Sequence, residues 1–500
     1  MSEPHVALSI PELLQEILEH LSMEGLNTGA LVCKAWLRPA VDTKWRTQNI
    51  KLSRLLSHLA PIERDGLLFA LIPEPLITHD HWHRFLEQYA NWITRLVLDM
   101  PLDEASIDLI SALLERFGGQ FGSNLISLNW SYETYIGDYT GGIIDLLPGT
   151  RLQEVDFHFN EQFYITGKNP LSQLAHRAPQ ISKLEGVFGS LDFSVFPRLQ
   201  CLSHSGSLST SDYHSLTYCR DLAVLFLQWT RVQIAPIHGT NTIFSRLEEF
   251  LLHRSEDEAE DMILQSVMPA LCSFKYFRQD AVGPFTIPLL NNISLTSPLL
   301  ENISFSIGVA PSQLELVQHD GVRSLSFGLY RLRSQLETEN LTDLLTIGRA
   351  FPNLENLRVF FHWTARPHNR ELTWHWHALP VLAEQLHHLQ HLTIPLHVPT
   401  SSLSEIPKEI APLRSLINLT FLALYIRQAD IDPFVSYLAI LFPNVQSIEV
   451  EVLSEVPDDW VVGMDLVPGN SRAFVDRFFD YRNRIRESQI SEGDLIEEAH

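Results

Sequence analysis

Histidine is the residue whose spacing first suggests chemistry in this chain. Three groups lie close together: His79, His81 and His83, then His375 and His377, then His387, His388 and His391. Neutral imidazole is a common metal ligand, and residues four apart, such as His387 and His391, share one face of a helix. However, a strand signature beginning at Leu389 interrupts that helix, and no cysteine or paired-carboxylate pattern completes a tetrahedral site. We therefore expect hydrogen-bonded or solvated histidines and no bound metal.

The sequence also lacks the best-defined catalytic motifs. It contains no P-loop, GxGxxG, GxSxG or HExxH segment, which are the signatures of phosphate, dinucleotide, esterase and zinc-protease sites. The four cysteines form no CxxC pair, which fits neither a cysteine zinc site nor a disulfide framework. The sequence thus predicts a protein that is not an enzyme and uses no cofactor. The alternative, an enzyme using one histidine cluster, predicts bound metal.

Composition narrows the range of partners. The 500 residues are 45% hydrophobic and 19% charged, so the chain can bury large cores in several domains or in one repeat array. The formal net charge is -24 and no basic run occurs, which argues against a nucleic-acid partner. No signal-peptide pattern and no apolar run of roughly 20 residues is present, so we expect no membrane partner and an intracellular location, cytoplasmic or nuclear.

Three short helices are predicted in the first fifty residues. The first covers 10–21, opens with Pro11, and carries Leu14, Ile17, Leu18 and Leu21 on one face; the others cover 26–36 and 39–45. So small a unit buries about 60% of its extended surface or less, and exposed apolar patches usually mark an interface. Part of this surface must therefore meet another chain or domain.

The order of residues in these helices carries a family resemblance. The segment SIPELLQEILEHLSMEGLNTGALVCKAWLRPAVDTKWRT, within residues 7–52, closely resembles the F-box, through its Pro-Glu-Leu-Leu opening and its Leu-Val-Cys-Lys-x-Trp core. The resemblance implies that the unit binds the Skp adaptor of a cullin-type ubiquitin ligase. Ile10 departs from the leucine that is common before the proline. The implied adaptor-binding residues are Leu8, Ile10, Pro11, Leu14, Ile17, Leu31, Val32, Cys33 and Trp36.

A second pattern repeats over residues 93–455. It is an apolar residue, two variable residues, an apolar residue, one variable residue and a final apolar residue, and it recurs with a mean spacing of about 27 residues, within the range of leucine-rich repeats. The units at Ile181 and Leu199 match least well. The first positions are Ile93, Leu125, Leu152, Ile181, Leu199, Leu222, Leu247, Leu271, Leu300, Val322, Leu354, Leu389, Leu419 and Val445.

This pattern predicts an α/β repeat fold. Each L-x-L ending forms a short strand with one buried face, and many preceding segments have helical periodicity. Repetition of these units stacks the strands into a parallel sheet on the concave face of a curved, irregular leucine-rich-repeat solenoid of 13–14 repeats. The concave face is the expected binding surface. Trp229 and Trp363 fall beyond the inward positions and are candidates for target contact, whereas Trp130 is expected in the core.

Two further segments flank the repeats. Residues 53–92, which include His81-Trp82-His83-Arg84-Phe85-Leu86, are predicted to form a helical linker. Together with the repeat register after it, this linker resembles F-box proteins that are abundant in mushroom-forming fungi. Within residues 456–500, Phe474, Phe478, Tyr481 and Ile485 have helical spacing, which predicts a helix capping the last repeat before an acidic tail.

Together these features favour a non-catalytic substrate-recognition subunit of a cullin-type ubiquitin ligase. The F-box would bind the Skp adaptor, and through it a cullin, while the solenoid would hold an unknown target protein. The alternative is a leucine-rich-repeat scaffold that does not act in ubiquitination.

Overall fold

A computed structural model of the chain resolves two compact units, Met1–Thr242 and Ile243–His500, and each is described separately. The repeats predicted for residues 93–455 are therefore shared between two units. The structure describes residues 10–65, 68–72, 77–99, 102–131, 146–147, 150–158, 170–187, 191–206, 208–228, 232–233, 242–253, 266–277, 287–305, 319–329, 346–361, 374–397, 411–426, 430–450 and 474–485.

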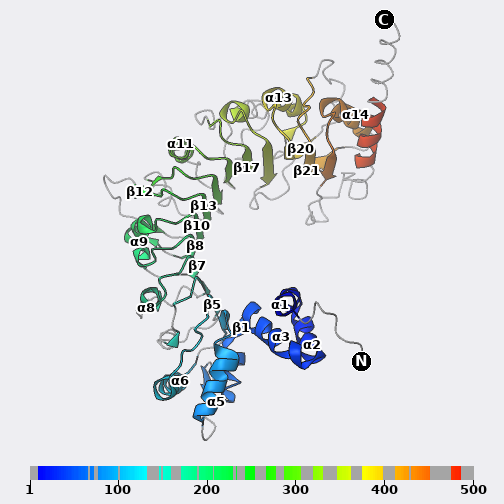
Figure 1. Ribbon diagram of the computed structural model, residues 1–500. Coiled ribbons are helices and arrows are strands. Elements are labelled where there is room, and N and C mark those ends of the chain that lie inside the picture. Colours follow the sequence, from blue (N-terminus) through cyan, green and yellow to red (C-terminus); the bar gives the residue numbers. More distant parts are fainter. Residues whose placement is uncertain are drawn as a thin grey trace, which may run out of the picture. The chain divides into compact units, whose positions relative to one another are not determined.

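The first unit begins with three helices, α1 (Pro11–Glu19), α2 (Met23–Val32) and α3 (Lys34–Thr47) (Figure 1). Leu14, Leu18 and Leu26 form their buried core. Two boundaries differ from the sequence prediction. The Ser22 hydroxyl accepts a hydrogen bond from the Gly25 amide, so α2 starts three residues earlier than expected. The helix then ends before Cys33, whose extended backbone (φ -161°) places Trp36 in α3.

The segment predicted as a helical linker contains helices, but it also contains a hairpin. Strand β1 (Ile50–Lys51) already pairs in parallel with β4 (Arg95–Leu98), so the sheet begins before residue 53. Between these strands lie α4 (Leu52–Leu56), an antiparallel hairpin of β2 (Ile62–Asp65) and β3 (Leu68–Leu71), α5 (His79–Phe85) and a π-helical turn, Leu86–Ala90. The strand sequences IERD and LFAL do not alternate between apolar and polar residues, so no strand pattern distinguished this hairpin in the sequence.

Contacts tie α3 to this first part of the sheet. The Trp45 ring lies edge-on to the rings of His58 and Tyr89, at centroid distances of 5.5 and 5.4 Å. The Thr94 hydroxyl donates to the Arg46 carbonyl at the end of α3. The three-helix segment is therefore held against the first unit by aromatic packing and hydrogen bonding.

The sheet of the first unit is parallel and runs in the order β1-β4-β5-β6-β7-β8-β10. Each strand enters it in sequence order, and helices cover one face, as Figure 1 shows for α6, α8 and α9. The strands are β5 (Ser127–Ser131), β6 (Glu154–His158), β7 (Lys183–Val187), β8 (Cys201–Ser205) and β10 (Val224–Gln228); β9 (Leu208–Ser209) and β11 (Val232–Gln233) form a separate pair. The helices are α6 (Glu104–Phe117), α8 (Pro170–Arg177), α9 (Thr210–Ser215) and two 3-10 turns, Phe193–Val195 and Leu216–Tyr218.

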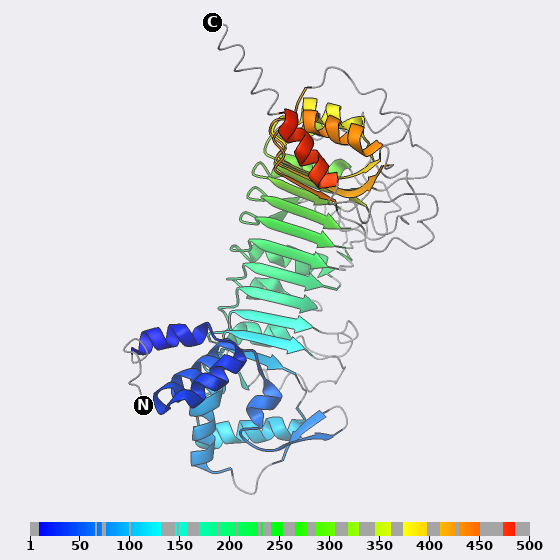
Figure 2. The same cartoon turned by 90° about the vertical axis from the view of Figure 1, so that its right-hand side faces the viewer.

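The second unit repeats this plan with the order β13-β15-β16-β17-β18-β20-β21-β22 (Figure 2). The strands are β13 (Glu249–His253), β15 (Ser273–Phe277), β16 (Asn302–Phe305), β17 (Ser324–Leu329), β18 (Asn356–Phe361), β20 (His391–His397), β21 (Asn418–Tyr425) and β22 (Ser447–Val450). Strand β19 (Trp374–His375) pairs with β20, and β12 (Thr242–Ile243) pairs with β14 (Ser266–Val267). The helices are α11 (Ile287–Thr296), α13 (Ala378–Gln385) and α14 (Ile431–Leu441).

The predicted signature fixes where the repeat strands begin. In thirteen of the fourteen predicted repeats the first apolar residue is buried and lies two residues before the strand, as Ile93 does before β4. One predicted position is wrong. The register pairs Asn418 with His391. Leu416, which is 0% exposed, is therefore equivalent to Leu389 as the first apolar residue of its repeat. The predicted residue, Leu419, is the second apolar residue of that repeat. Full burial of each such leucine contributes about 1.5–3 kcal/mol.

The two poorly matching repeats have unusual residues at the third apolar position. Gly186 occupies it in β7 and the fully buried His204 occupies it in β8. The Gly186 backbone has φ +128°, and a Cβ there would lie 1.8 Å from the Phe157 carbonyl oxygen. Close approach of β6 to β7 thus requires glycine where the pattern expects a leucine.

At the carboxyl end of the second unit, residues 474–485 are helical and pack on the last repeats. Phe474 and Phe478 are 3% and 0% exposed, and Phe474 contacts the rings of Phe421 and Phe434. Tyr481, which the spacing placed on the same apolar face, is 41% exposed. The covering contact therefore comes from two phenylalanines one helical turn apart.

Candidate protein-binding surfaces

The histidine groups do not converge on a metal site. Across the part of the chain that the structure describes, no three His, Cys, Asp or Glu side chains are arranged to hold a metal ion. His79 and His83 pack ring against ring in α5, at 4.2 Å. Helix α13 ends at Gln385, so His387 and His391 do not share a helix, and His391 lies in β20 beside Asn418, 2.7 Å from its amide nitrogen.

The cysteines differ in environment. Cys33 is exposed between α2 and α3, whereas Cys219 is buried and its thiol donates a hydrogen bond to the Phe193 carbonyl, at 3.3 Å. Burial, assisted by the negative charge of Asp192, raises the pKa of the Cys219 thiol to about 12. Since the thiolate is the reactive species, Cys219 is a packing residue and not a nucleophile.

Iodoacetamide is expected to alkylate Cys33 in the native protein at about pH 8 and to leave Cys219 unmodified until the protein is unfolded, because reaction requires an accessible thiolate. Peptide mass spectrometry of samples quenched at successive times measures the two rates. Equal rates for the two cysteines in the native protein would contradict the burial and hydrogen bonding described here.

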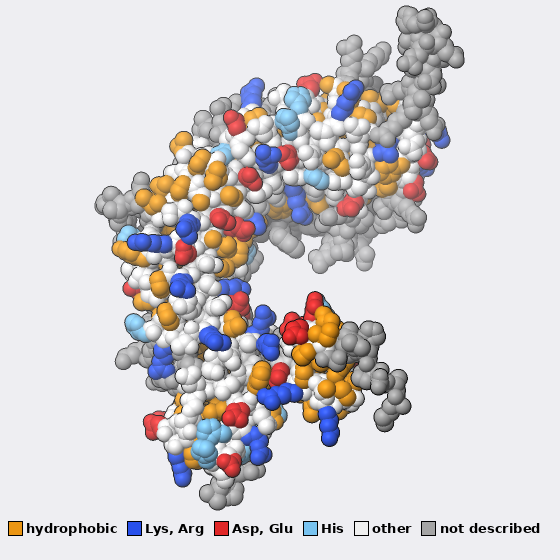
Figure 3. Space-filling model, in the orientation of Figure 1, with side chains coloured by type: hydrophobic (Ala, Val, Ile, Leu, Met, Phe, Trp, Pro, Cys, Tyr) orange, Lys and Arg blue, Asp and Glu red, His pale blue; other side chains and the backbone are white. Residues whose placement is uncertain are grey.

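Hydrophobic side chains gather on the surface of the three-helix segment (Figure 3). Leu31 is 85% exposed and Val32 is 59% exposed at the end of α2, and Leu37 is 49% exposed in α3. Ile10, Leu13 and Ile17 are each about two-fifths exposed, with spacings of three and four residues that place them on one side of α1. Such a concentration of apolar surface on a small helical unit is typical of an interface.

The structure separates the implied adaptor-binding residues into groups. Ile10, Pro11, Ile17, Leu31, Val32 and Cys33 are exposed, whereas Leu14 is 5% exposed in the core and Trp36 packs against that core while half-buried. Leu8 lies outside the described residues. Leu14 is therefore corrected from a contact residue to a core residue. The surface also includes Leu13 and Leu37, which the resemblance did not assign.

Two pairs of outward-facing polar residues in the first unit's sheet bind each other. The Asn129 amide donates to the Asp156 carboxylate, at 2.6 Å, across β5 and β6. Lys183 and Glu185 form an ion pair at 3.2 Å. Partial burial alone would lower the pKa of Lys183, but its hydrogen bond to Glu185 and the charge of that carboxylate outweigh burial and raise it. Each of these four side chains therefore already has a hydrogen-bond or ion-pair partner within the sheet.

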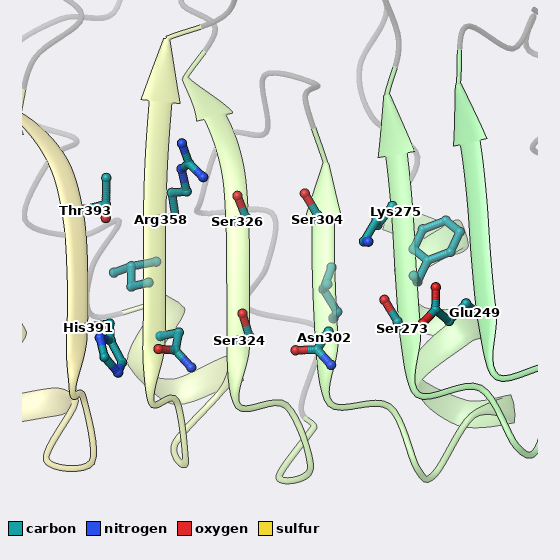
Figure 4. A pocket seen from close by; sticks show the side chains of 14 residues that line it. Glu249, Ser273, Lys275, Asn302, Ser304, Ser324, Ser326, Arg358, His391 and Thr393 are labelled. Atoms are coloured by element: carbon teal, nitrogen blue, oxygen red, sulfur yellow. The ribbon is translucent and has the colours of Figure 1, made fainter. Parts of the chain in front are cut away.

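The second unit carries a groove of about 570 Å³ on the face of its strands (Figure 4). Its polar lining forms two rows that run across the strands in register. The first row is Glu249, Ser273, Asn302, Ser324, Asn356 and His391. The second row is Lys275, Ser304, Ser326, Arg358 and Thr393.

The groove differs from the first unit's face in its unmet hydrogen-bonding capacity. Considering only described residues, Lys275, Arg358 and the serines between them make no side-chain hydrogen bond or ion pair. The sequence pointed to the outward strand positions as a class, and the register identifies which of them form one surface. The serine and asparagine residues that line the groove did not distinguish it from other strands in the sequence.

Trp229 and Trp363, the two candidates for target contact, lie outside the described residues. Trp130 is fully buried and stacks on Phe157 at 5.2 Å, which confirms its core position. Trp376 is likewise fully buried and lies edge-on to Tyr437.

Within the described helices, none is both long enough and apolar enough to cross a bilayer.

Comparison with known proteins gives structural likeness only. No protein-family model matches the chain, and no curated protein matches it in sequence. A leucine-rich-repeat protein of Leptospira interrogans is 13% identical with a TM-score of 0.39, covering 76% of this chain and 88% of that one. An internalin from Listeria monocytogenes is 12% identical with a TM-score of 0.29, covering 56% and 78% respectively. A structure of the Drosophila Toll–Spätzle complex gives 10% identity and a TM-score of 0.27, with coverage of 75% and 60%.

The fold assignment rests on this chain's own repeats. Parallel strands enter each sheet in sequence order, and each repeat strand is preceded, two residues earlier, by a buried Leu, Ile or Val. This is the architecture of a leucine-rich-repeat solenoid, a fold that presents an extended surface for protein partners.

Proposed function

We propose that this chain is a substrate-recognition subunit of a cullin-type ubiquitin ligase. The three-helix segment binds the Skp adaptor and the repeat sheet holds a target protein. The observation that carries the proposal is the uncovered apolar surface of α1 and α2, on the segment whose sequence resembles the F-box.

The most exposed side chains of this surface do not belong to the core of the segment. Leu14, Leu18 and Leu26 form that core, whereas Leu31 and Val32 are 85% and 59% exposed. Contact with a partner would remove their apolar area from water, at about 25 cal/mol per Å². The aromatic contacts of Trp45 with His58 and Tyr89 hold α3 to the first unit, which supports an adaptor-binding segment firmly joined to the repeats.

The role is one of positioning and not of bond chemistry. A receptor that holds its target beside a transferring enzyme raises the effective concentration of the target at that enzyme. The exposed apolar surface of the three-helix segment and the polar groove of the second unit support two separate binding roles.

A double variant, Ile17→Asp with Val32→Asp, tests the adaptor contact. Both side chains are exposed, so the variant is expected to fold, but binding would bury two unpaired carboxylates and weaken adaptor affinity by at least about 30-fold. Titration of the purified full chain with the Skp adaptor, followed by calorimetry, measures the change.

The matched control is Leu295→Asp, in α11 of the second unit. Leu295 is 85% exposed, so it accepts the same chemical change on a surface without a proposed adaptor role, and adaptor affinity should be unchanged. A folded wild-type chain that does not bind the adaptor, or a double variant that binds as well as wild type, would refute the proposal. The protein would then be a repeat scaffold outside ubiquitination.

A further inference from the structure

We infer that the groove of the second unit binds an extended peptide segment bearing two carboxylate side chains about four residues apart. This inference deepens the proposed function, on which its biological role rests, by naming the chemical class of the target. It starts from the positions of the only cations in the groove lining, Lys275 and Arg358.

These two cations lie in one row at a fixed separation. The register pairs Lys275 with Ser304, Ser304 with Ser326, and Ser326 with Arg358. Three strand spacings of about 4.8 Å place their Cα atoms about 14 Å apart. In Figure 4 both side chains extend from their strands toward the serines between them.

The separation suits an extended chain lying across the strands. At about 3.3 Å per residue, four residues of extended peptide span about 13 Å. Two acidic side chains at positions i and i+4 also point to the same side, because alternate residues of an extended chain face the same way. Each carboxylate would then reach one cation.

The residues between and beside the cations suit a peptide backbone. Ser304 and Ser326 are small and leave room above the sheet, and their hydroxyls both donate and accept hydrogen bonds. The first row adds Asn302 and Asn356, whose amides can bond peptide N–H and C=O groups. None of these four side chains is already bonded to another described residue.

Charge favours an acidic occupant at this place specifically. The whole chain carries a formal charge of -24. By contrast, the second row contains two cations and no carboxylate between β15 and β20, so its charge is positive. Glu249 lines the β13 end of the groove and would repel an acidic side chain placed there. This repulsion restricts the carboxylates to the span from Lys275 to Arg358. Two cations are too few to hold a nucleic-acid backbone, which favours a peptide.

Selection from a phage-displayed library of random linear peptides tests the inference on the full chain. Peptides with Asp or Glu at positions i and i+4 are expected to be enriched on the wild-type protein. A Lys275→Glu/Arg358→Glu variant should enrich none of them, and should bind the best synthetic peptide at least about 100-fold more weakly, since each charged hydrogen bond is worth roughly tenfold or more. Replacing the two acids by Gln and Asn should weaken wild-type binding to a similar degree.

The control variant is Arg414→Glu, which reverses an exposed cation of the same unit outside the groove and should leave peptide affinity unchanged. The inference is wrong if no peptide is enriched, if enriched peptides lack the acidic pair, or if the charge-reversed variant retains them. Binding only when phosphoserine replaces the acids would also overturn it, in favour of a phosphopeptide site. The adaptor is not part of this experiment, so the outcome is independent of adaptor binding.

Discussion

Gly186→Ala is expected to destabilise the first unit by about 2 to 6 kcal/mol. The glycine has φ +128°, a conformation that costs an L-residue about 1–3 kcal/mol. The added Cβ would also lie 1.8 Å from the Phe157 carbonyl oxygen and 2.5 Å from its carbonyl carbon. These are backbone atoms in the neighbouring strand, so β6 and β7 must separate, and such overpacking costs about 1–3 kcal/mol more.

Hydrogen exchange provides a local measurement of this effect. Amides of β6, β7 and β8 should lose protection in the variant, together with a lower unfolding midpoint in denaturant. Gly118→Ala is the matched control, since Gly118 also has positive φ, +72°, but a Cβ there meets nothing within 4 Å. It should cost only about 1–3 kcal/mol, from its backbone conformation alone. Equal effects of the two substitutions would show that strand contact at Gly186 contributes nothing.

Replacing both Phe474 and Phe478 by alanine is expected to remove the helix of residues 474–485 from the second unit. Burial of each ring is nearly complete, and truncation of a buried phenylalanine costs about 3 to 5 kcal/mol. An ion pair between Arg477 and Asp432, at 2.9 Å, is exposed and too weak to hold the helix alone. The apolar residues of β21 and α14 beneath it, including Phe421 and Phe434, would then meet water.

The expected readout is lost hydrogen-exchange protection in β21 and α14, and self-association at higher protein concentration, because an uncovered terminal repeat exposes core surface. Tyr481→Ala is the control on the same helix. Its ring is 41% exposed, so the substitution should change stability by less than about 0.5 kcal/mol. Unaltered protection of β21 in the double variant would mean that the helix does not cover the last repeats.

The three-helix segment illustrates a limit of helical periodicity. The sets Leu14–Leu18–Leu21 and Ile10–Leu13–Ile17 both have the spacing of a single helix face, so spacing alone does not tell which set is internal. Packing decides it. Leu14, Leu18 and Leu26 are buried together, and Gly29 of α2 faces the same core, since a Cβ there would lie in ordinary contact with Leu18 and Trp36, at 3.5 and 3.8 Å. A Leu14→Ala variant would therefore probe folding of the segment and not adaptor contact.

Local sequence determined the repeat strands and their inward faces. The apolar signature located thirteen of the fourteen strand entries between β4 and β22, because each leucine must be buried for a short strand to be stable. It missed by three residues at Leu416, where LINLTF and LTFLAL both satisfy the same pattern. Periodicity cannot choose between two overlapping matches, and pairing with β20 does.

The tertiary structure alone decided which outward side chains share a surface. Lys275 and Arg358 are 83 residues apart in the sequence, and the insertions between repeats vary in length, so sequence spacing says nothing of their distance. Parallel pairing with exact register aligns them in one row. The sequence by itself thus determined the fold and the segment that resembles an adaptor-binding unit, because the local spacing of apolar residues indicates which side chains are buried. The groove depended on strand register, which is a long-range property of the folded chain.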